Sequence, residues 1–148
     1  MNHTSEALNS TVPLGIGLVS LQRTFAKRLA VPFSEEHSNT DQWCVLAAIA
    51  KLASPTMSDL ALESGLANAT LTRTVDSLVN NALVFRLADK GDRRRINVYL
   101  SDFGRQRLNR LNDIADASEK ALADEIGDPL LGRLRRCVDQ TIIALSND

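Results

Sequence analysis

Long apolar runs are missing from this sequence of 148 residues. A membrane-spanning helix needs about 20 consecutive apolar residues, and no stretch of the chain approaches that length. The N-terminus also lacks the basic start and the apolar core of a secretory signal peptide. We therefore expect a cytoplasmic protein that makes no contact with a membrane.

Cysteines and aromatic residues are scarce. The two cysteines, Cys44 and Cys137, are far apart and each lies in an apolar helical pattern, so we expect buried, reduced thiols and no disulfide framework or zinc cluster. Aromatic residues make up 4% of the chain and hydrophobic residues 44%. This composition is typical of a soluble and largely helical protein, and the length suffices for the core of one domain.

Groups of residues that could carry out catalysis are missing as well. The only candidates are Cys44 as a nucleophile and His37 as a base, with Glu35 or Glu36 beside it. A thiol in an apolar helix has a raised pKa and low reactivity. The sequence has no glycine-rich phosphate loop and no metal-ligand spacing, so we expect no enzyme, no cofactor and no metal site.

The net charge of −1 hides an uneven distribution of charge. Residues 66–110 contain nine Lys or Arg and four Asp or Glu, a net charge of +5. The segments 1–65 and 111–148 carry net charges of −2 and −4. A basic segment between acidic ones is the pattern expected when one surface of a protein contacts phosphate.

Helical periodicity dominates both ends of the chain. Apolar residues recur every three or four positions over residues 12–30, and Pro32 is expected to end this helix. Asn39 or Thr40 can cap a second, strongly apolar helix, with Gln42 completing a capping box. Two further long helices are predicted between residues 105 and 145, with a break at the sequence Gly-Asp-Pro that begins at residue 127.

The middle of the chain predicts two short helices joined by a tight turn. Thr56 can cap a helix that ends at Gly65, and Asn68 can cap a helix that runs to about Asn81. Leu71, Val75 and Leu78 would form the inward face of that second helix. Two short helices around a small-residue turn make a helix-turn-helix.

A β-hairpin is predicted directly after the helix-turn-helix. Val84 to Ala88 and Ile96 to Leu100 form its strands, in which Ile96, Val98 and Leu100 face one way while Asn97 and Tyr99 face the other. The tip, Asp89 to Arg95, is polar and basic. The expected fold class is therefore mainly α with a small β-hairpin wing: a winged helix-turn-helix with N- and C-terminal dimerisation helices.

This order of elements, together with two motifs, resembles the multiple antibiotic resistance regulator (MarR) family. The stretch from Asp89 to Gly104 is similar to the family's wing pattern of Asp, two residues, Asp-Arg-Arg, alternating apolar residues, then Ser or Thr and a later Gly. The stretch from Asn68 to Leu78 resembles the family's recognition helix, although the family often has Ser at the first position. A weaker similarity covers residues 42–46 of the second helix.

The resemblance implies a homodimeric transcription regulator that binds double-stranded DNA at a pseudo-palindromic operator. Repression, relieved by a small aromatic or phenolic effector bound between the dimerisation helices and the DNA-binding lobe, is the expected mode of action. The single domain would span residues 1–148, with dimerisation helices at 12–30 and 105–145 and a DNA-binding lobe at 39–100. Leu18, Trp43 and Leu111, near the junction, are expected to be core residues and not the walls of a pocket.

The predicted DNA-contacting residues lie on the second short helix and on the wing. They are Asn68, Ala69, Thr70, Thr72, Arg73, Ser77, Lys90, Asp92, Arg93, Arg94 and Arg95. Arg73 suits a guanine edge, and the two threonines suit phosphates or a thymine methyl group. The resemblance assigns Arg94 to the minor groove, held by an ion pair with Asp92. The plainer interpretations are a solvated arginine run and an ordinary turn residue.

A winged helix can also bind protein instead of DNA, because the fold alone does not determine the partner. This alternative is a protein-interaction module without specific DNA binding. The segregated positive charge of residues 66–110 favours DNA.

Overall fold

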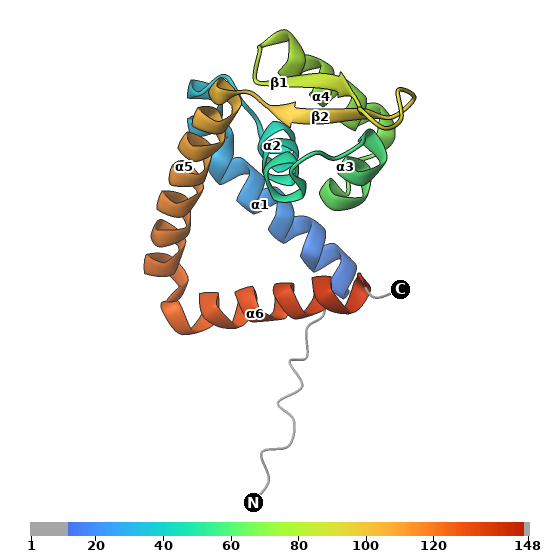
Figure 1. Cartoon of the computed structure of the whole chain (residues 1–148). Helices are drawn as coiled ribbons and strands as arrows, with labels where there is room; N and C mark the ends of the chain where they lie inside the picture. Colours follow the sequence, from blue (N-terminus) through green and yellow to red (C-terminus); the bar gives the residue numbers. More distant parts are fainter. Residues whose placement is uncertain (1–11, 147–148) are drawn as a thin grey trace, which may run out of the picture.

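The computed structural model describes residues 12–146. Within them the chain forms six helices and a β-hairpin (Figure 1). The elements are α1 (Leu14–Glu35), α2 (Thr40–Leu52), α3 (Met57–Ser64), α4 (Asn68–Asn80), β1 (Val84–Ala88), β2 (Ile96–Leu100), α5 (Asp102–Ile126) and α6 (Asp128–Leu145). Figure 1 shows α1, α5 and α6 as three long helices arranged like the sides of a triangle, with the other elements gathered in a lobe at one side.

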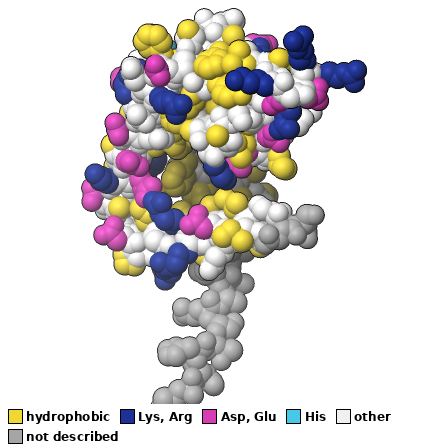
Figure 2. Space-filling model, in the orientation of Figure 1, with side chains coloured by type: hydrophobic (Ala, Val, Ile, Leu, Met, Phe, Trp, Pro, Cys, Tyr) yellow, Lys and Arg dark blue, Asp and Glu magenta, His cyan; other side chains and the backbone are white. Residues whose placement is uncertain are grey.

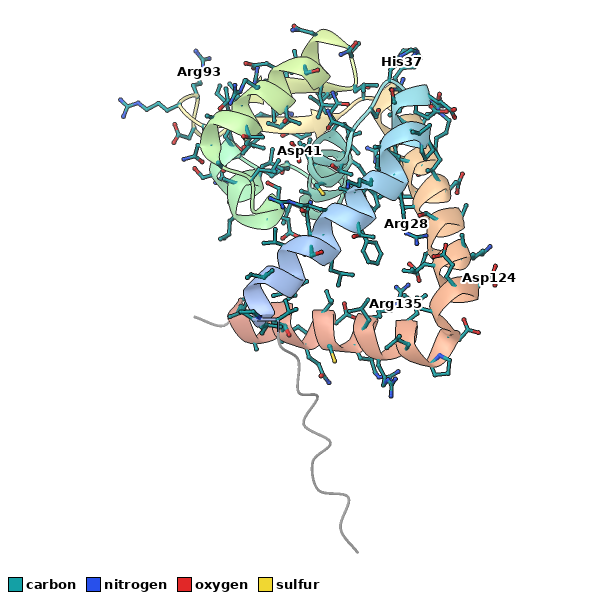
Figure 3. All side chains as sticks on the ribbon, turned by 180° about the vertical axis from the view of Figure 1, so that it is seen from behind. Arg28, His37, Asp41, Arg93, Asp124 and Arg135 are labelled. Carbon is teal, nitrogen blue, oxygen red and sulfur yellow. The ribbon has the colours of Figure 1, made fainter. Side chains whose placement is uncertain are left out.

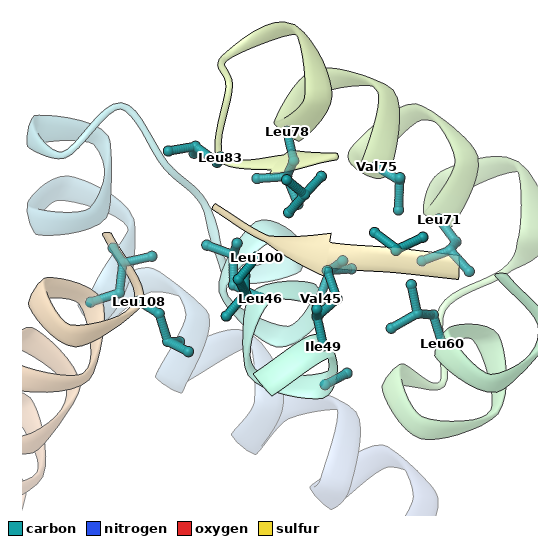
Figure 4. Packing of buried hydrophobic residues seen from close by; sticks show 14 of the residues in the cluster. Val45, Leu46, Ile49, Leu60, Leu71, Val75, Leu78, Leu83, Leu100 and Leu108 are labelled. Carbon is teal, nitrogen blue, oxygen red and sulfur yellow. The ribbon is translucent and has the colours of Figure 1, made fainter. Parts of the chain in front are cut away.

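The core of the lobe lies around α2. Val45, Leu46 and Ile49 of this helix are 0–1% exposed and belong to the same core cluster as Leu60 of α3 and Val75 of α4 (Figure 4). Burying one such aliphatic side chain contributes about 1.5–3 kcal/mol. Leu71 and Leu78 are buried as well, which confirms the predicted inward face of α4.

Capping residues set several of the helix ends. Asn39 caps α2 by accepting the backbone N–H of Gln42, and Thr56 and Asp59 form a reciprocal capping box on α3. Gly65 ends α3 in the left-handed conformation at φ 66°. The predicted cap of α4 is wrong, because Asn68 is already helical and the residue before it, Ala67, provides no side-chain hydrogen bond.

The prediction that Pro32 ends the first helix is also wrong, since α1 continues to Glu35. Proline lacks the backbone N–H of an interior helical residue, which costs about 3 kcal/mol. The last turn nevertheless carries Phe33, which is fully buried and packs edge-on against Trp43 with ring centroids 5.4 Å apart. Packing of this aromatic side chain offsets the lost hydrogen bond.

The hairpin has its predicted strands, paired antiparallel with Val84 opposite Leu100. Val84, Val98 and Leu100 are buried against the lobe, but Ile96 on the same face is 43% exposed. Asn97, expected on the other face, is only 3% exposed. The outer edge of β2 explains this burial, because Asn97 forms a β-bridge with Thr56 and the N–H of Val98 donates to the carbonyl of Pro55 at 2.9 Å.

The long helices leave much apolar surface uncovered. Leu108, Leu111 and Leu122 of α5 are buried, whereas α6, which begins after Gly127, buries no residue. The first half of α1 is likewise exposed at Leu14 and other apolar positions. No helix within residues 12–146 has the length and hydropathy needed to cross a membrane.

Candidate nucleic-acid interface

The face of α4 that points away from the core carries short polar side chains and one arginine. Asn68, Ala69, Thr72 and Arg73 are exposed, and the Nε of Arg73 donates to the carbonyl of Ala69 at 3.2 Å. The terminal amino groups of Arg73 have no partner among the described residues. They are therefore available to an acceptor outside the chain.

Two predicted contact residues of α4 are less accessible. Thr70 is half-buried, and so is Ser77, whose hydroxyl accepts a hydrogen bond from the Gln42 side chain at 3.2 Å. Ser77 thus joins α4 to α2 and does not lie on the open face. The amide of Gln42, expected to complete the capping box of α2, is used in this bond instead.

An ion pair that the sequence pattern does not reveal links α4 to the hairpin. Arg86 of β1 lies 2.7 Å from Asp76 of α4. Spacing along the chain could not show this pair, because a turn and a change of direction separate the two residues. The pair ties β1, the strand that leads to the wing tip, to α4.

The wing tip carries the densest positive charge of the lobe. Lys90, Arg93, Arg94 and Arg95 are all exposed, and Arg93 extends away from the body of the protein (Figure 3). Figure 2 shows basic side chains projecting at this edge of the molecule. Arg95 differs from the others because its guanidinium turns toward α3, where it lies 3.9 Å from Asp59.

Asp92 does not form the expected ion pair with Arg94 in the described part of the chain. Its carboxylate instead accepts the backbone N–H of Arg94 at 3.0 Å, a local turn interaction that a short side chain reaches more easily. Asp89, a residue absent from the predicted set, accepts the backbone N–H groups of Gly91 at 2.7 Å and Asp92 at 3.2 Å. The bond from Gly91 is the main reason why the pKa of Asp89 is lowered.

Helix α4 and the wing tip lie on the same lobe and present two separate polar surfaces. Seen from behind, α4 lies on the near side, and the wing tip projects beside it (Figure 3). An α-helix fits the major groove of B-DNA, whereas arginines favour the strongly negative minor groove. The two surfaces therefore differ in the groove of a duplex that each would suit.

The candidate catalytic residues do not form a site. The prediction of buried thiols is wrong, since Cys44 and Cys137 are both exposed. Cys44 nevertheless lies among apolar side chains, and this burial, with a smaller effect of Asp41, raises its pKa. His37 is an exposed turn residue, and Glu36 pairs with Arg110 at 2.8 Å. The described residues contain no group of three or more His, Cys, Asp or Glu that could hold a metal ion.

A recess with a volume of about 590 Å³ lies between α1, α2, α5 and α6. Figure 2 shows it as a hollow with apolar side chains below the lobe. Leu111 is fully buried, as expected, but Leu18 is 56% exposed and Trp43 half-buried, and both line the recess. The prediction that they are core residues and not the walls of a pocket is therefore wrong for Leu18. Trp43 does pack against the core cluster, but it also lines the recess.

Comparisons with known proteins agree with this geometry. Residues 38–95 match the family model described as MarR family. Apo MarR from E. coli is 21% identical with a TM-score of 0.78, and the match covers 89% of this chain and 98% of that chain. A cysteine-to-serine mutant of the same E. coli protein, complexed with operator DNA, is 22% identical with a TM-score of 0.77, covering 93% and 99%.

A third similar structure is Bordetella bronchiseptica BpsR, whose DNA binding is described as regulated by 6-hydroxynicotinic acid. It is 16% identical with a TM-score of 0.77, and the match covers 94% of this chain and 96% of that chain. A comparison with curated protein sequences finds no match. The described chain therefore has the winged-helix fold of the E. coli MarR structures, and its segment 38–95, which contains the helix-turn-helix and the wing tip, matches the MarR family model.

Proposed function

We propose that this protein is a sequence-specific DNA-binding regulator of transcription that acts in the cytoplasm as a homodimer, and not as an enzyme. The observation that carries the proposal is the open polar face of α4 beside a wing tip with exposed arginines. Both belong to the only segment of the chain with a strongly positive charge, residues 66–110. The operator-bound structure of E. coli MarR supports the same use of this fold here.

In the proposed complex, α4 enters the major groove and the wing reaches the flanking minor groove. Asn68 and Ala69 lie at the N-terminal end of α4, the end that contacts base edges in helix-turn-helix proteins. Arg73, one turn later, has amino groups free to make two hydrogen bonds with guanine. Arg93 and Arg94 supply the positive charge at the minor groove.

Exposed apolar side chains at the two ends of the chain support a twofold dimer. Each of these side chains is between 38% and 79% exposed. Together they form more apolar surface than monomeric soluble proteins usually expose in one region. On α1 they are Leu14, Ile16, Leu18, Val19 and Leu21, and on α6 Leu130, Val138, Ile142, Ile143 and Leu145. A second copy would cover them and place two recognition helices about one helical turn of DNA apart.

Repression relieved by a small aromatic or phenolic effector completes the proposal. A dimer bound near a promoter blocks polymerase, and the recess of about 590 Å³ has the size of a small-molecule site. Trp43 lines this recess, and the preceding residue of α2, Gln42, bonds to Ser77 of α4. A ligand that moves the start of α2 would therefore also disturb the recognition helix.

Selection of bound sequences from random duplex DNA, followed by affinity measurements at two salt concentrations, tests the proposal. We expect a pseudo-palindromic consensus and an affinity that falls steeply with salt, because phosphate contacts release counterions. A protein-interaction module would yield no consensus and no salt-dependent binding of duplex.

A further inference from the structure

Asn97 is a buried polar residue that packing alone does not explain. It is 3% exposed, and its Oδ1 is buried without a hydrogen-bond partner among the described residues. An unpaired buried amide oxygen destabilises the folded state. Leucine has a similar volume and would match the cross-strand neighbour Leu87, which is apolar. A residue that lowers stability at such a position points to a function.

The side chain of Asn97 holds the carboxylate that organises the wing tip. Its Nδ2 donates to Asp89 Oδ2 at 3.2 Å, while Oδ1 of Asp89 accepts the backbone N–H groups of Gly91 and Asp92. These two backbone groups immediately precede Arg93. A single carboxylate thus connects the buried start of β2 to the loop that carries the wing arginines.

The backbone of Asn97 is in turn anchored to the helix-turn-helix. It bridges to Thr56, the residue that caps α3 together with Asp59. Asp59 also lies 3.9 Å from the guanidinium of Arg95, two residues before Asn97 at the same end of the wing loop. The β2 side of the wing loop is therefore tied directly to the start of α3, and the β1 side is tied to it through the hydrogen bond between Asn97 and Asp89.

We infer that Asn97 and Asp89 are positioning residues that hold the wing tip at a set angle to α3 and α4. The arginines then meet the duplex while α4 is seated in its groove, without first losing loop entropy. The inference rests on the proposed function. It assigns to these two residues a role in DNA affinity that neither exerts by touching DNA.

The Asn97→Leu variant tests this role. We expect a melting temperature that is unchanged or raised, because the unpaired oxygen is removed, and an affinity for the selected duplex that is about tenfold lower. Amide hydrogen exchange should become faster at Gly91 and Asp92 and stay unchanged in α2. Leu87→Ala is the matched control, since Leu87 is exposed opposite Asn97 in the hairpin and should leave binding and exchange unaltered.

Asp89→Asn tests the same role in a variant for which charge and positioning predict opposite changes in affinity. It also keeps the inference testable if Asn97→Leu fails to fold. Removing one negative charge beside the arginines should tighten binding if charge alone mattered. Loss of positioning should weaken it instead. In an Arg94→Ala background, Asn97→Leu should cause little further loss of affinity, because the two changes act through the same contact.

Three results would each overturn the inference. They are wild-type affinity and exchange rates in Asn97→Leu, tighter binding in Asp89→Asn, and additive losses of affinity in the double variant. Failure of the wild-type protein to bind duplex in a salt-dependent way would instead overturn the proposed function. In that case the exchange rates at Gly91 and Asp92 still decide whether Asn97 orders the wing.

Discussion

Arginines with the same formal charge have different surroundings in this lobe. Arg86 pairs with Asp76, Arg95 turns toward Asp59, and Arg94 has no ion pair among the described residues. The sequence alone does not distinguish these side chains, because each is simply an arginine in a basic segment. Their contacts show that Arg93 and Arg94, unlike Arg86 and Arg95, have no ion pair among the described residues.

Arg73→Ala should weaken binding to the selected duplex by about 1–3 kcal/mol and relax the preference at one base pair of each half-site. The reason is the loss of a contact with a base edge. Competition with duplexes substituted at single positions measures both effects. Lys120→Ala, which removes an equal charge from an exposed site on α5, is the control. A uniform loss across all competitors would contradict a base contact by Arg73.

Arg94→Ala should weaken binding to all duplexes and flatten the salt dependence of the affinity, because the wing loses a positive charge that would face the phosphates of the groove. Arg94→Lys should recover little, since the lysine ammonium is more strongly hydrated than a guanidinium. Titrations at several salt concentrations give the slopes. If affinity fell with salt at the same slope in Arg94→Ala and Lys120→Ala, the arginines would be only solvated residues at a hairpin tip.

Cys44 should react slowly at neutral pH although part of its surface is exposed. Its apolar surroundings raise the pKa of the thiol and keep it protonated, and only the thiolate is nucleophilic. In Cys137→Ser, the rate of alkylation should rise with pH to a midpoint above that of a free cysteine peptide. Peroxide should leave operator affinity unchanged. Rapid alkylation at neutral pH would show that Cys44 is activated.

At the scale of elements, the junction between the hairpin and α5 depends on one close approach. A Cβ added at Gly104 would lie 2.0 Å from the carbonyl oxygen of Leu83, a backbone atom. The same junction is tied by Ser101, whose hydroxyl donates to Ala82 at 2.7 Å and accepts the N–H of Gly104. This contact explains the glycine of the wing pattern in physical terms.

Gly104→Ala should lower the free energy of unfolding by about 1–3 kcal/mol or more, because the backbone of the junction must move. Gly17→Ala is a matched control within α1, where nothing lies within 4 Å of the added carbon. That variant should be neutral or more stable by about 0.5–1 kcal/mol. Urea denaturation measures both. A Gly104→Ala protein of wild-type stability would mean that the junction is not tightly packed.

The whole molecule should be a dimer. Sedimentation at micromolar concentration is expected to show about twice the chain mass of 16.2 kDa. Ile143→Asp should yield a folded monomer with weak affinity for a palindromic duplex, because α6 buries no residue in its own chain. Leu62→Asp, at an 88% exposed position on α3, should remain dimeric. A wild-type monomer that binds the palindrome tightly would contradict this architecture.

Local chemistry was sufficient to predict most elements from the sequence. The Asn39 and Thr56 caps, the Gly65 turn and the bounds of β2 depend on residues within a few positions of one another. The positive charge at the wing tip could be predicted for the same reason, since a hairpin loop of charged residues has nowhere to lie except in solvent. The roles of the predicted DNA-contacting residues remain predictions.

Only the tertiary structure decided where long-range packing outweighs local preference. Phe33 keeps α1 helical through Pro32 because its burial depends on Trp43 of another helix. Cys44 is exposed because the helices around it leave a recess, which no periodicity reveals. Asn97 and Asp89 come together because the hairpin folds back and the Thr56 segment covers its edge. The residues in such contacts are far apart in the sequence or on different elements, so only the folded chain brings them together.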